Sequence, residues 1–451
     1  MVKIGLEIHG YIKTKEKLFC RCPANYKEKI DPNKNICPIC TGYPGAKPML
    51  PNKEAIKKVI AIGIMLGCKI NKELFFQRKH YDWPDLPKGY QNTISGSYST
   101  TNAEKGEFLG IRIKEIHLEE DPAKWDPESG YVDFNRSGLP LVEIVTEPDF
   151  TSSKQVRKWL NDFITLMSYI NCIEENAGIK CDVNISTTGE RVEIKNLNSM
   201  YSIEKAIESE ISRQSLEKSE GRKIKRETRR YDEKLKTTVL MREKEGAEDY
   251  RFIPDPDLPK IIISEKMIKE IESTLPEPPK VKKEKYIRLG IEKSQAEILT
   301  RNKDIAEFFE SLTVKNKKLA AYWTTIELLR VLNYNNKTLK EVNISPEHFS
   351  KLLDLVDSKK ITELAAKEIL NRFIPKSFNP EQDLRNNLRI DDEKEIESIC
   401  KEVIKLNEKA VQDYKSGEEK ALNFIIGQVM ARTKGRADSL ITKKLIIKLL
   451  K

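Results

Sequence analysis

Strict alternation of hydrophobic and polar residues occurs in several short segments of the first 260 residues. In Ile4–His9 the apolar side chains of Ile4, Leu6 and Ile8 alternate with Gly5, Glu7 and His9. Successive side chains of a β-strand point to opposite faces, so Glu7 and His9 share one face. We predict an antiparallel sheet with one buried face and one open face. The same alternation occurs at Ile116–Glu119, Tyr131–Asn135, Cys181–Ile185 and Val192–Lys195.

Beyond residue 290 the apolar residues recur at helical spacing instead. Asp304–Leu312 and Leu319–Leu329 are the clearest examples, and few strand-like segments interrupt them. A proline-rich and charged stretch from Pro254 to Lys285 precedes this region and predicts a stiff connector. We therefore predict an α+β protein with three parts. These are an antiparallel-sheet domain (1–285), an all-α helical domain (286–395) and a small α-helical tail domain (396–451).

Composition and charge narrow the class of protein. Hydrophobic residues make up 39% of the 451, enough for well-packed cores, and the net charge of +10 permits an anionic partner. Basic residues accumulate near the C-terminus, which suits such a partner. The longest apolar run, Val59–Cys68, is too short to span a bilayer and predicts a core helix. We predict a soluble cytoplasmic protein without a membrane partner.

Cysteine spacing predicts a metal site. Four of the eight cysteines lie between residues 20 and 40, as a Cys-x-Cys pair (Cys20, Cys22) and a Cys-x-x-Cys pair (Cys37, Cys40). Four thiolates on two tight turns suit tetrahedral Zn²⁺ with no open position, hence a structural zinc-binding insertion at 20–40. The alternative is a set of buried free thiols. Core positions are expected for the other four, Cys68, Cys172, Cys181 and Cys400.

Acidic residues recur on the polar side of the predicted strands. Solvated outer faces are the usual meaning of such alternation, but carboxylates are poor strand formers. Here they recur on at least three strands, twice beside one of only four histidines. Like charges converging on one face would repel unless a hard cation neutralised them. The pattern therefore predicts a Mg²⁺ site on the open face.

The segment Gln77–Gln91 combines aromatic residues, charges of both signs and two prolines. Loops this rich in hydrogen-bonding groups usually line a site, although a purely structural loop has the same composition. The sequence contains no G-x-x-x-x-G-K-[ST] motif, no kinase signature set, no G-x-S-x-G motif and no Ser/Gly-rich amidase signature. If the protein uses ATP, we expect it to do so through a metal-bearing sheet face.

From end to end the sequence resembles the B subunit of the tRNA-dependent amidotransferases. Its motifs are long and numerous, which makes the resemblance highly specific. The segments that carry it are Gly5–His9, Lys17–Cys20, Cys37–Gly45, Arg78–Gln91, His117–Asp121, Val132–Asp149, Cys181–Asn184, Glu193–Ser199, Glu227–Arg229, Asp249–Phe252 and Ile426–Gly435.

This resemblance implies a cradle-shaped catalytic domain similar to glutamine synthetase, followed by a helical domain and a tail domain that binds tRNA. It implies a ligase that forms a carbon–nitrogen bond with glutamine as amide donor. ATP would phosphorylate the side-chain carboxylate of misacylated Glu-tRNA(Gln) or Asp-tRNA(Asn), or of both, and ammonia would displace the phosphate. The ammonia would come from an amidase A subunit, and a small C subunit would complete a heterotrimer.

The resemblance also implies roles for individual residues. The cofactors would be ATP, Mg²⁺ and structural Zn²⁺. The expected catalytic residues are Glu7, His9, Glu119, Glu120 and Glu193, and the expected Mg²⁺ ligands are Glu7, His9, Glu119, Glu193 and Glu227. The expected phosphate contacts are Arg136 and Lys195, and the expected ammonia path comprises Lys79, Tyr81, Asp85, Lys88 and Tyr90. Glu120 falls on the opposite strand face from Glu119 unless the strand ends there.

Two other functions remain open at this point. One is a non-catalytic, zinc-bearing tRNA-binding protein, against which the intact Glu7, His9, Glu119 and Glu193 argue. The other is a small-molecule ligase similar to glutamine synthetase, for which a basic tail would have no use. The sequence does not indicate which of the two misacylated tRNAs is the substrate.

Overall fold

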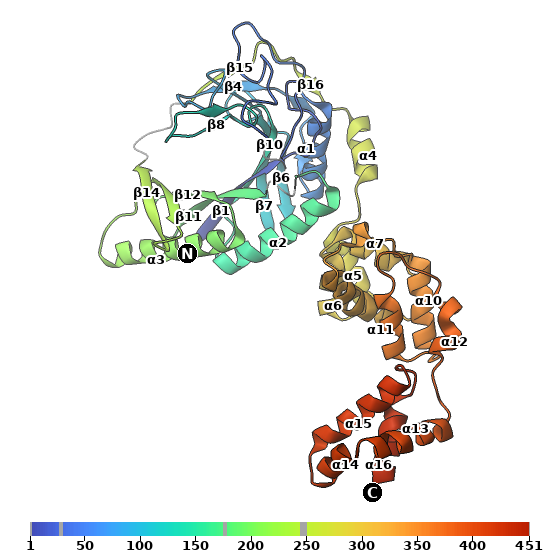
Figure 1. Cartoon of the computed structure of the whole chain (residues 1–451). Coiled ribbons are helices and arrows are strands. Elements are labelled where there is room, and N and C mark those ends of the chain that lie inside the picture. Colours follow the sequence, from blue (N-terminus) through green and yellow to red (C-terminus); the bar gives the residue numbers. More distant parts are fainter. Residues whose placement is uncertain (1, 27–29, 175–177, 244–249, 451) are drawn as a thin grey trace. The chain divides into compact units, whose positions relative to one another are not determined.

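The computed structural model of the chain describes residues 2–26, 30–174, 178–243 and 250–450. It divides into two compact units, Met1–Pro278 and Pro279–Lys451 (Figure 1), and each is described by itself. Asp249, the first residue of one motif named above, and Lys451 lie outside the described residues.

A twelve-stranded sheet forms the framework of the first unit, in the order β14-β13-β12-β11-β1-β10-β7-β5-β4-β15, with β2 and β6 branching beside β7. Every described pairing in it is antiparallel except β12 with β13, which is parallel. The predicted antiparallel sheet is therefore confirmed apart from that one pair. Its strands are β1 (Lys3–Tyr11), β2 (Lys69–Ile70), β4 (Gln77–His80), β5 (Gln91–Thr93), β6 (Ala103–Phe108), β7 (Ile111–Glu120), β10 (Pro140–Thr146), β11 (Ile179–Ser186), β12 (Val192–Leu197), β13 (Glu227–Asp232), β14 (Thr237–Glu243) and β15 (Arg251–Pro254).

One predicted strand is wrong. Only Val132–Asp133 (β9) is extended in the segment Tyr131–Asn135, and it pairs with β8 (Lys124–Trp125) in a separate two-stranded sheet. The Asp133 carboxylate instead accepts hydrogen bonds from the backbone N–H groups of Asn33 and Asn135. Short Asp and Asn side chains that bond to nearby backbone favour turns over strands, which explains why alternation alone misled.

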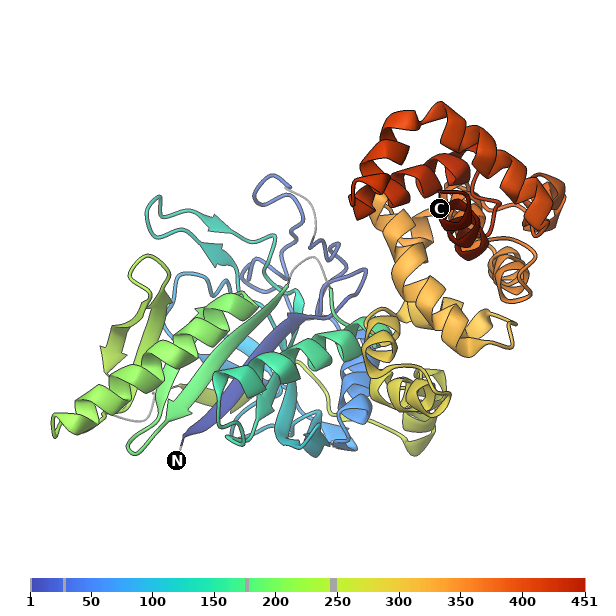
Figure 2. The same ribbon diagram turned by 90° about the horizontal axis from the view of Figure 1, so that it is seen from below.

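Three helices cover one face of the large sheet: α1 (Lys53–Met65), α2 (Ser153–Ile170) and α3 (Met200–Ser219). The sheet is curved and these helices lie on its convex side (Figure 1), with α2 and α3 side by side (Figure 2). Both α2 and α3 begin after a serine whose hydroxyl accepts a hydrogen bond from the third residue on, the usual N-cap geometry. The concave face of the sheet is thus the one that carries the polar side chains.

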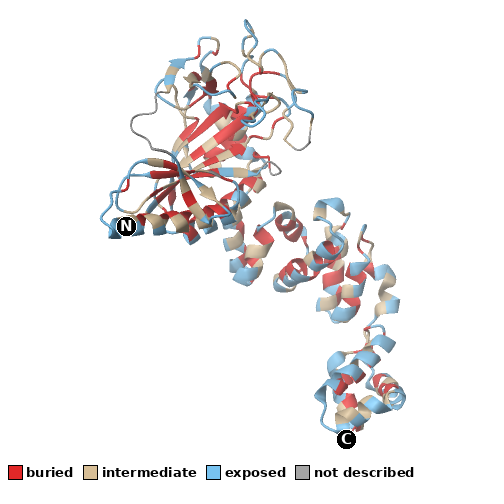
Figure 3. Ribbon diagram, turned by 60° about the vertical axis from the view of Figure 1, so that its left-hand side comes forward, coloured by how far each residue is buried: buried red, intermediate tan, exposed pale blue. Residues whose placement is uncertain are grey.

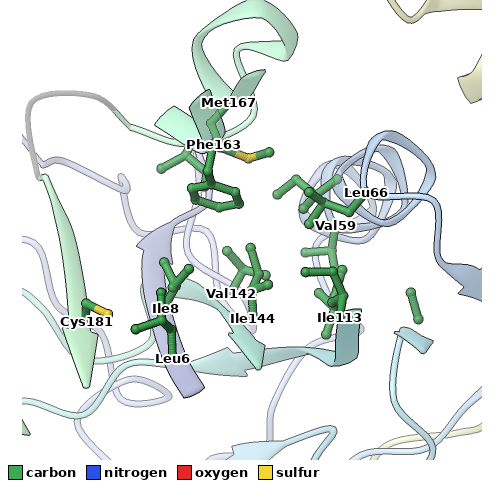
Figure 4. Close-up of a cluster of buried hydrophobic side chains, with 14 of the residues drawn as sticks. Leu6, Ile8, Val59, Leu66, Ile113, Val142, Ile144, Phe163, Met167 and Cys181 are labelled. Carbon is green, nitrogen blue, oxygen red and sulfur yellow. The ribbon is translucent and has the colours of Figure 1, made fainter. Parts of the chain in front are cut away.

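Apolar side chains of the strands and helices meet on the convex side. Leu6 and Ile8 of β1 pack with Val142 and Ile144 of β10 and with Phe163 of α2 (Figure 4). All five are essentially inaccessible to solvent, and buried residues line the strands and the inner sides of the helices (Figure 3). The predicted core helix at Val59–Cys68 corresponds to α1 and its C-terminal turn. Further elements of this unit are β3 (Glu73–Leu74), β16 (Ile261–Ile262) and α4 (Glu265–Thr274).

Every regular element among the described residues of the second unit is a helix. Its two expected helical segments are confirmed, the second as α8, a π-helical turn η2, and α9. Within the parts of the chain described, no helix is long and apolar enough to cross a membrane. The elements are α5 (Pro279–Arg288), α6 (Lys293–Thr300), α7 (Lys303–Ser311), α8 (Lys317–Tyr322), η2 (Trp323–Leu328), α9 (Leu329–Tyr334), η3 (Leu339–Glu341), α10 (Pro346–Asp357), α11 (Glu363–Asn371), η4 (Pro380–Asp383), α12 (Leu384–Asn387), α13 (Glu393–Leu406), α14 (Glu408–Lys415), α15 (Glu419–Arg432) and α16 (Ser439–Leu450).

Domain limits differ slightly from those expected from sequence. The expected limit at residue 285 falls inside α5, whose Tyr286 is buried in the core of the helical unit, so the division lies at Pro278. The helical unit contains two separate hydrophobic clusters. One lies between Tyr286 and Phe373, and the other begins at Ile390, just before α13.

Candidate active site and metal centre

Acidic side chains converge on the concave face because the strand register aligns them. Glu7 of β1 lies opposite Asp182 of β11, and His9 lies opposite Glu143 of β10. Glu143 in turn lies opposite His117 of β7. Five neighbouring strands contribute, and we call these residues the acidic face: Glu7, His9, His117, Glu119, Glu143, Asp182 and Glu193.

Within the acidic face, two groups of three residues have the spacing of metal ligands. The ligand atoms of His9, Glu119 and Glu143 all lie within 4.8 Å of one another. Carboxylate oxygens are the ligands that Mg²⁺ prefers, and a cation between them would relieve their mutual repulsion. The donor set therefore fits divalent cations. The second group, with the same limit on separation, comprises Glu7, Asp182 and Glu193.

The electrostatics of the acidic face show an excess of negative charge. Burial and the neighbouring Glu143 carboxylate together raise the pKa of Glu7. The same two causes raise the pKa of Glu119 to about 7. A carboxylate that must bind a proton near neutral pH lacks a counter-charge, and a bound cation would supply one.

Hydrogen bonds from neighbouring side chains fix the orientation of three of these carboxylates. The Asn184 amide donates to Glu7 Oε1 at 2.9 Å. The hydroxyl of Thr93 donates to Glu119 Oε2, and that of Thr228 donates to Glu193 Oε2, each at 3.3 Å. Such bonds hold ligand carboxylates in one rotamer before a metal binds.

Of the two expected phosphate contacts, Lys195 lies on the acidic face. Its Nζ is 2.6 Å from Glu193 Oε1 and 3.1 Å from Asp182 Oδ2. Burial works against its charged form, but these two carboxylates outweigh that effect and raise the pKa of Lys195. Lys195 is therefore a cation at neutral pH in the middle of an anionic surface.

Arg136, the other expected phosphate contact, lies in the turn after β9. Its Nε is 3.1 Å from Asp121 Oδ2 and donates to the carbonyl of Pro122. The Tyr11 hydroxyl donates to the same Asp121 oxygen at 2.6 Å. Arg136 is thus held in a fixed position by a buried carboxylate, which Tyr11 at the end of β1 also holds.

Glu120 and Glu227 are not brought to the acidic face. Glu120 follows Glu119 on the opposite side of β7 and accepts hydrogen bonds from Lys88 Nζ and the backbone N–H of Asn92. Glu227 lies 2.6 Å from Arg229 Nη1. The next residue on β13, Thr228, is the one that reaches Glu193, because neighbouring side chains alternate in direction. Glu227, expected as a Mg²⁺ ligand, and Glu120, expected as a catalytic residue, are thus directed away from the acidic face.

The segment Gln77–Gln91 is only partly a loop, since its ends belong to β4 and β5. Lys79 Nζ lies 4.3 Å from the ring centre of Tyr250 and 5.8 Å from that of Tyr81. Burial and Glu143 raise the pKa of Glu119, whereas the positive charge of Lys79 lowers it. Lys79 therefore lies close enough to the acidic face to act on Glu119.

The remaining expected residues of the ammonia path lie further along this segment. Lys88 Nζ lies 5.1 Å from the ring centre of Tyr90, and Arg78 stacks on the same ring at 4.3 Å. The backbone carbonyl of Asp85 accepts a hydrogen bond from Ala123, and burial raises the pKa of the Asp85 carboxyl. Cations thus lie against aromatic rings at both ends of this segment.

The four N-terminal cysteines converge into one cluster. The sulfur atoms of Cys20, Cys22, Cys37 and Cys40 all lie within 4.8 Å of one another. The Cys37 and Cys40 sulfurs are 3.9 Å apart, close to the roughly 3.8 Å edge of a tetrahedron with metal–sulfur bonds of about 2.3 Å. A hydrogen bond from Cys20 and the charge of Lys17 lower the pKa of Cys40 to about 5 against the effect of burial. The cluster could therefore hold a metal ion.

Comparison with known proteins agrees with this geometry. The family model described as the GatB/GatE catalytic domain matches residues 2–269, and the model described as the GatB domain matches residues 307–450. The chain belongs to this family. The catalytic-domain match covers the entire acidic face and the cysteine cluster, and the second match covers most of the helical unit.

Several archaeal proteins are similar to this member of the GatB/GatE family over nearly their whole length. Three of them are named as the B subunit of an aspartyl/glutamyl-tRNA(Asn/Gln) amidotransferase. The one from Methanocaldococcus jannaschii is 45% identical, over 100% of this chain and 97% of its own length. The one from Methanopyrus kandleri is 43% identical, over 99% of this chain and 98% of its own length. The one from Methanococcus maripaludis strain C6 is also 43% identical, over 97% of this chain and 96% of its own length.

Sequence reasoning missed Glu143 and did not assign Asp182 to a metal, although both belong to this family member's ligand groups. Asp182 had a usable signal, since it alternates with apolar residues in Cys181–Ile185. No alternation marks Glu143, because the two residues that share its strand face, Leu141 and Val145, are both apolar.

Proposed function

We propose that the chain is the catalytic subunit of an ATP-dependent amidotransferase that acts on misacylated Glu-tRNA(Gln), Asp-tRNA(Asn) or both. The observation that carries this proposal is the acidic face, with two ligand groups on adjacent strands of one curved sheet. Membership of the GatB/GatE family and the names of its relatives support it. A curved sheet with helices on its convex side also suits a cradle similar to that of glutamine synthetase.

The proposed chemistry follows from the weakness of a carboxylate as an electrophile. Transfer of the γ-phosphoryl group of ATP to a side-chain carboxylate oxygen releases ADP and leaves an acyl phosphate on the tRNA. Ammonia then attacks the carbonyl carbon, the bond to the phosphate oxygen breaks, and the nitrogen loses a proton to give the amide. Bound divalent cations would neutralise the phosphate charge during the transfer.

The chain's own residues position and compensate these charges. His9, Glu119 and Glu143 would hold one cation, and Glu7, Asp182 and Glu193 a second. Lys195, already cationic within the face, is placed to meet a phosphate oxygen, and Arg136 is held ready by Asp121. The cations and rings from Lys79 to Tyr90 suit a path that delivers ammonia to the acyl phosphate.

Phosphoryl transfer can be tested without the amide donor. Mixing the protein with γ-labelled ATP, Mg²⁺ and misacylated tRNA should move label onto the tRNA in a single turnover. Omitting the divalent cation should abolish the transfer. A protein that binds misacylated tRNA yet transfers no label would support the non-catalytic tRNA-binding alternative. Phosphorylation of free glutamate in place of the tRNA ester would support the small-molecule ligase.

The cysteine cluster is proposed to hold a structural zinc ion. We expect about one Zn²⁺ per chain, and Cys37→Ser should remove it and lower the melting temperature by roughly 5 °C or more. Cys68→Ser, a half-buried cysteine outside the cluster, is the matched control and should keep its zinc. Metal analysis and thermal unfolding measure both effects. Wild-type protein without zinc, prepared without chelator, would contradict the proposal.

The C-terminal helices are proposed to contact tRNA phosphates. On α16, Lys443, Lys444 and Lys448 are exposed while Leu445 and Ile446 are buried, so the helix presents a basic side to solvent. Each lysine that contacts a phosphate should contribute about 0.7 to 0.9 to the salt slope of binding. Changing all three to Gln should weaken tRNA binding and reduce that slope by as much as about 2.7.

Point changes are preferable to truncation because a cut inside α13 would expose the cluster around Ile396 and Cys400. The matched control changes three exposed lysines of the sheet unit, Lys57, Lys266 and Lys269, to Gln. That control should bind tRNA as the wild type does. Equal affinity and salt dependence for the α16 variant would show that its lysines are only a solvated helix face.

A further inference from the structure

Lys17 is a buried lysine whose charge is not balanced by a carboxylate of the described residues. The residue is 1% exposed, among the lowest values of any charged residue described. The comparably buried Lys282 is paired with the carboxylate of Glu310 at 2.5 Å. Among the residues that the structure describes, no carboxylate forms an ion pair with Lys17. An isolated ammonium in a protein interior is strongly unfavourable, so another negative group must compensate it.

Two groups lie within hydrogen-bond reach of the Lys17 ammonium, and one of them can balance its positive charge. Nζ lies 3.6 Å from the sulfur of Cys40 and 3.2 Å from the backbone carbonyl oxygen of Phe134. The carbonyl is a dipole and carries no net charge. Four protonated thiols would likewise offer no charge, whereas four thiolates around one Zn²⁺ leave two net negative charges. Four zinc-bound thiolates therefore supply more negative charge than Lys17 needs, and the Cys40 sulfur beside its Nζ is the group that brings this charge to the lysine.

We propose that Lys17 is the charge-compensating partner of a tetracysteine zinc centre and contributes directly to its affinity for the metal. The lysine contacts a ligand sulfur and does not bind the metal. This inference rests on the zinc site proposed above and is independent of the amidation reaction. Groups that surround a metal site in this way typically change metal affinity by about 10- to 100-fold when removed.

The backbone around Lys17 places it between both cysteine pairs and a neighbouring turn. Its N–H donates to the carbonyl of Cys22 at 3.0 Å, and the N–H of Leu18 donates to the carbonyl of Gly138 at 2.8 Å. The Ser137 hydroxyl donates to the carbonyl of Cys40 at 2.6 Å. Since Lys17 Nζ also bonds to Phe134, one side chain links the metal ligands to the turn of residues 134–138.

That turn carries Arg136, which is the proposed phosphate contact. A second contact joins the cysteine cluster to the segment Gln77–Gln91. Gly42, with φ of +68°, approaches the carbonyl oxygen of Pro87 so closely that a Cβ atom would lie 2.2 Å from it. The cysteine cluster is therefore joined to the turn that carries Arg136 and to the segment Gln77–Gln91, and Lys17 is the charged group in the first of these connections.

The test compares zinc affinity of full-length variants by competition with a chromogenic chelator. Lys17→Met removes the charge at similar length, and Lys17→Gln removes the charge but keeps a donor for the Phe134 carbonyl. The zinc affinity of both variants should be about 10- to 100-fold lower than that of the wild type. Lys15→Met, the same change at an exposed lysine two residues away, should match the wild type. Hydrogen exchange at residues 134–138 should also become faster in Lys17→Met, which lacks the donor to the Phe134 carbonyl.

Each outcome bears on a distinct part of the inference. Wild-type zinc affinity in Lys17→Gln would overturn it, because the lysine would then serve only as a hydrogen-bond donor. If Lys17→Met does not fold, Lys17→Gln still decides the question. A wild-type protein that binds no zinc would overturn both this inference and the zinc site. Loss of zinc affinity in protein that does not amidate tRNA would leave this inference standing while the proposed function failed.

Discussion

Glu7→Gln is expected to slow the ATP-dependent step by about 10²-fold or more, equivalent to about 2.7 kcal/mol of transition-state stabilisation. The substitution keeps the shape of the side chain and removes one negative charge from the group of Glu7, Asp182 and Glu193. Because this charge would compensate the proposed cation at the phosphate, its loss should affect phosphoryl transfer more than tRNA binding. The basic helix α16 belongs to the other compact unit, so tRNA affinity should change little.

Single-turnover phosphorylation of misacylated tRNA, with Mg²⁺ titrated, measures this effect. Glu107→Gln is the matched control, since Glu107 is an exposed carboxylate on β6 of the same sheet and should behave as the wild type. Near-wild-type rates for Glu7→Gln at low Mg²⁺ would show that Glu7 is a solvated strand residue. The catalytic groups would then have to be sought elsewhere on the sheet.

Glu143→Gln should produce a comparable loss of rate together with a shift in pH dependence. Glu143 shares a ligand group with His9 and Glu119, and its charge raises the pKa of both Glu7 and Glu119. In the wild type, Mg²⁺ bound at the proposed site below a pH of about 7 would have to displace a proton from Glu119, so the Mg²⁺ affinity should weaken as the pH falls. Gln lowers the pKa of Glu119 by removing a nearby negative charge. The weakening should therefore begin at a lower pH, although maximal affinity is reduced by the lost ligand.

Divalent-cation affinity measured from pH roughly 5 to 9 tests this expectation. Equal acid dependence in Glu143→Gln and wild type would show that Glu143 does not act on Glu119. A purely structural role for Glu143 would lower affinity without moving the acid limb. The Glu107→Gln variant again serves as the control and should reproduce the wild-type profile.

Much of the acidic face could be predicted from sequence because strand periodicity is local. Alternation alone put Glu7 and His9 together on the polar face of β1. It likewise put Glu119 and Glu193 on the polar faces of their own strands. The structure shows that these strands are neighbours in the sheet, in the order β12-β11-β1-β10-β7. Four of the seven residues of the acidic face were thus assigned a site role from the sequence.

The remainder depends on contacts between distant segments. Glu143 is hidden in an apolar run, and only its register with His9 and His117 identifies its role. Glu227 lies beside arginines because β13 pairs in parallel with β12 and places Thr228 on the acidic face. The contact of Lys17 with Cys40 could not be predicted either, because the residues around Lys17 do not show that its ammonium is buried beside a cysteine sulfur. Cysteine spacing, in contrast, was sufficient to predict the cluster.

The most direct test of the proposed function is amide formation by the purified chain supplied with ATP, Mg²⁺ and misacylated tRNA. With free ammonium as nitrogen donor, the chain alone should form the amide. With glutamine it should form none, because the sequence carries no amidase signature, and addition of the amidase A and small C subunits should restore glutamine use. Glutamine-dependent amide formation by the chain alone, or ammonium-dependent formation that requires no ATP, would contradict the assignment of the phosphorylation and amidation steps to the acidic face.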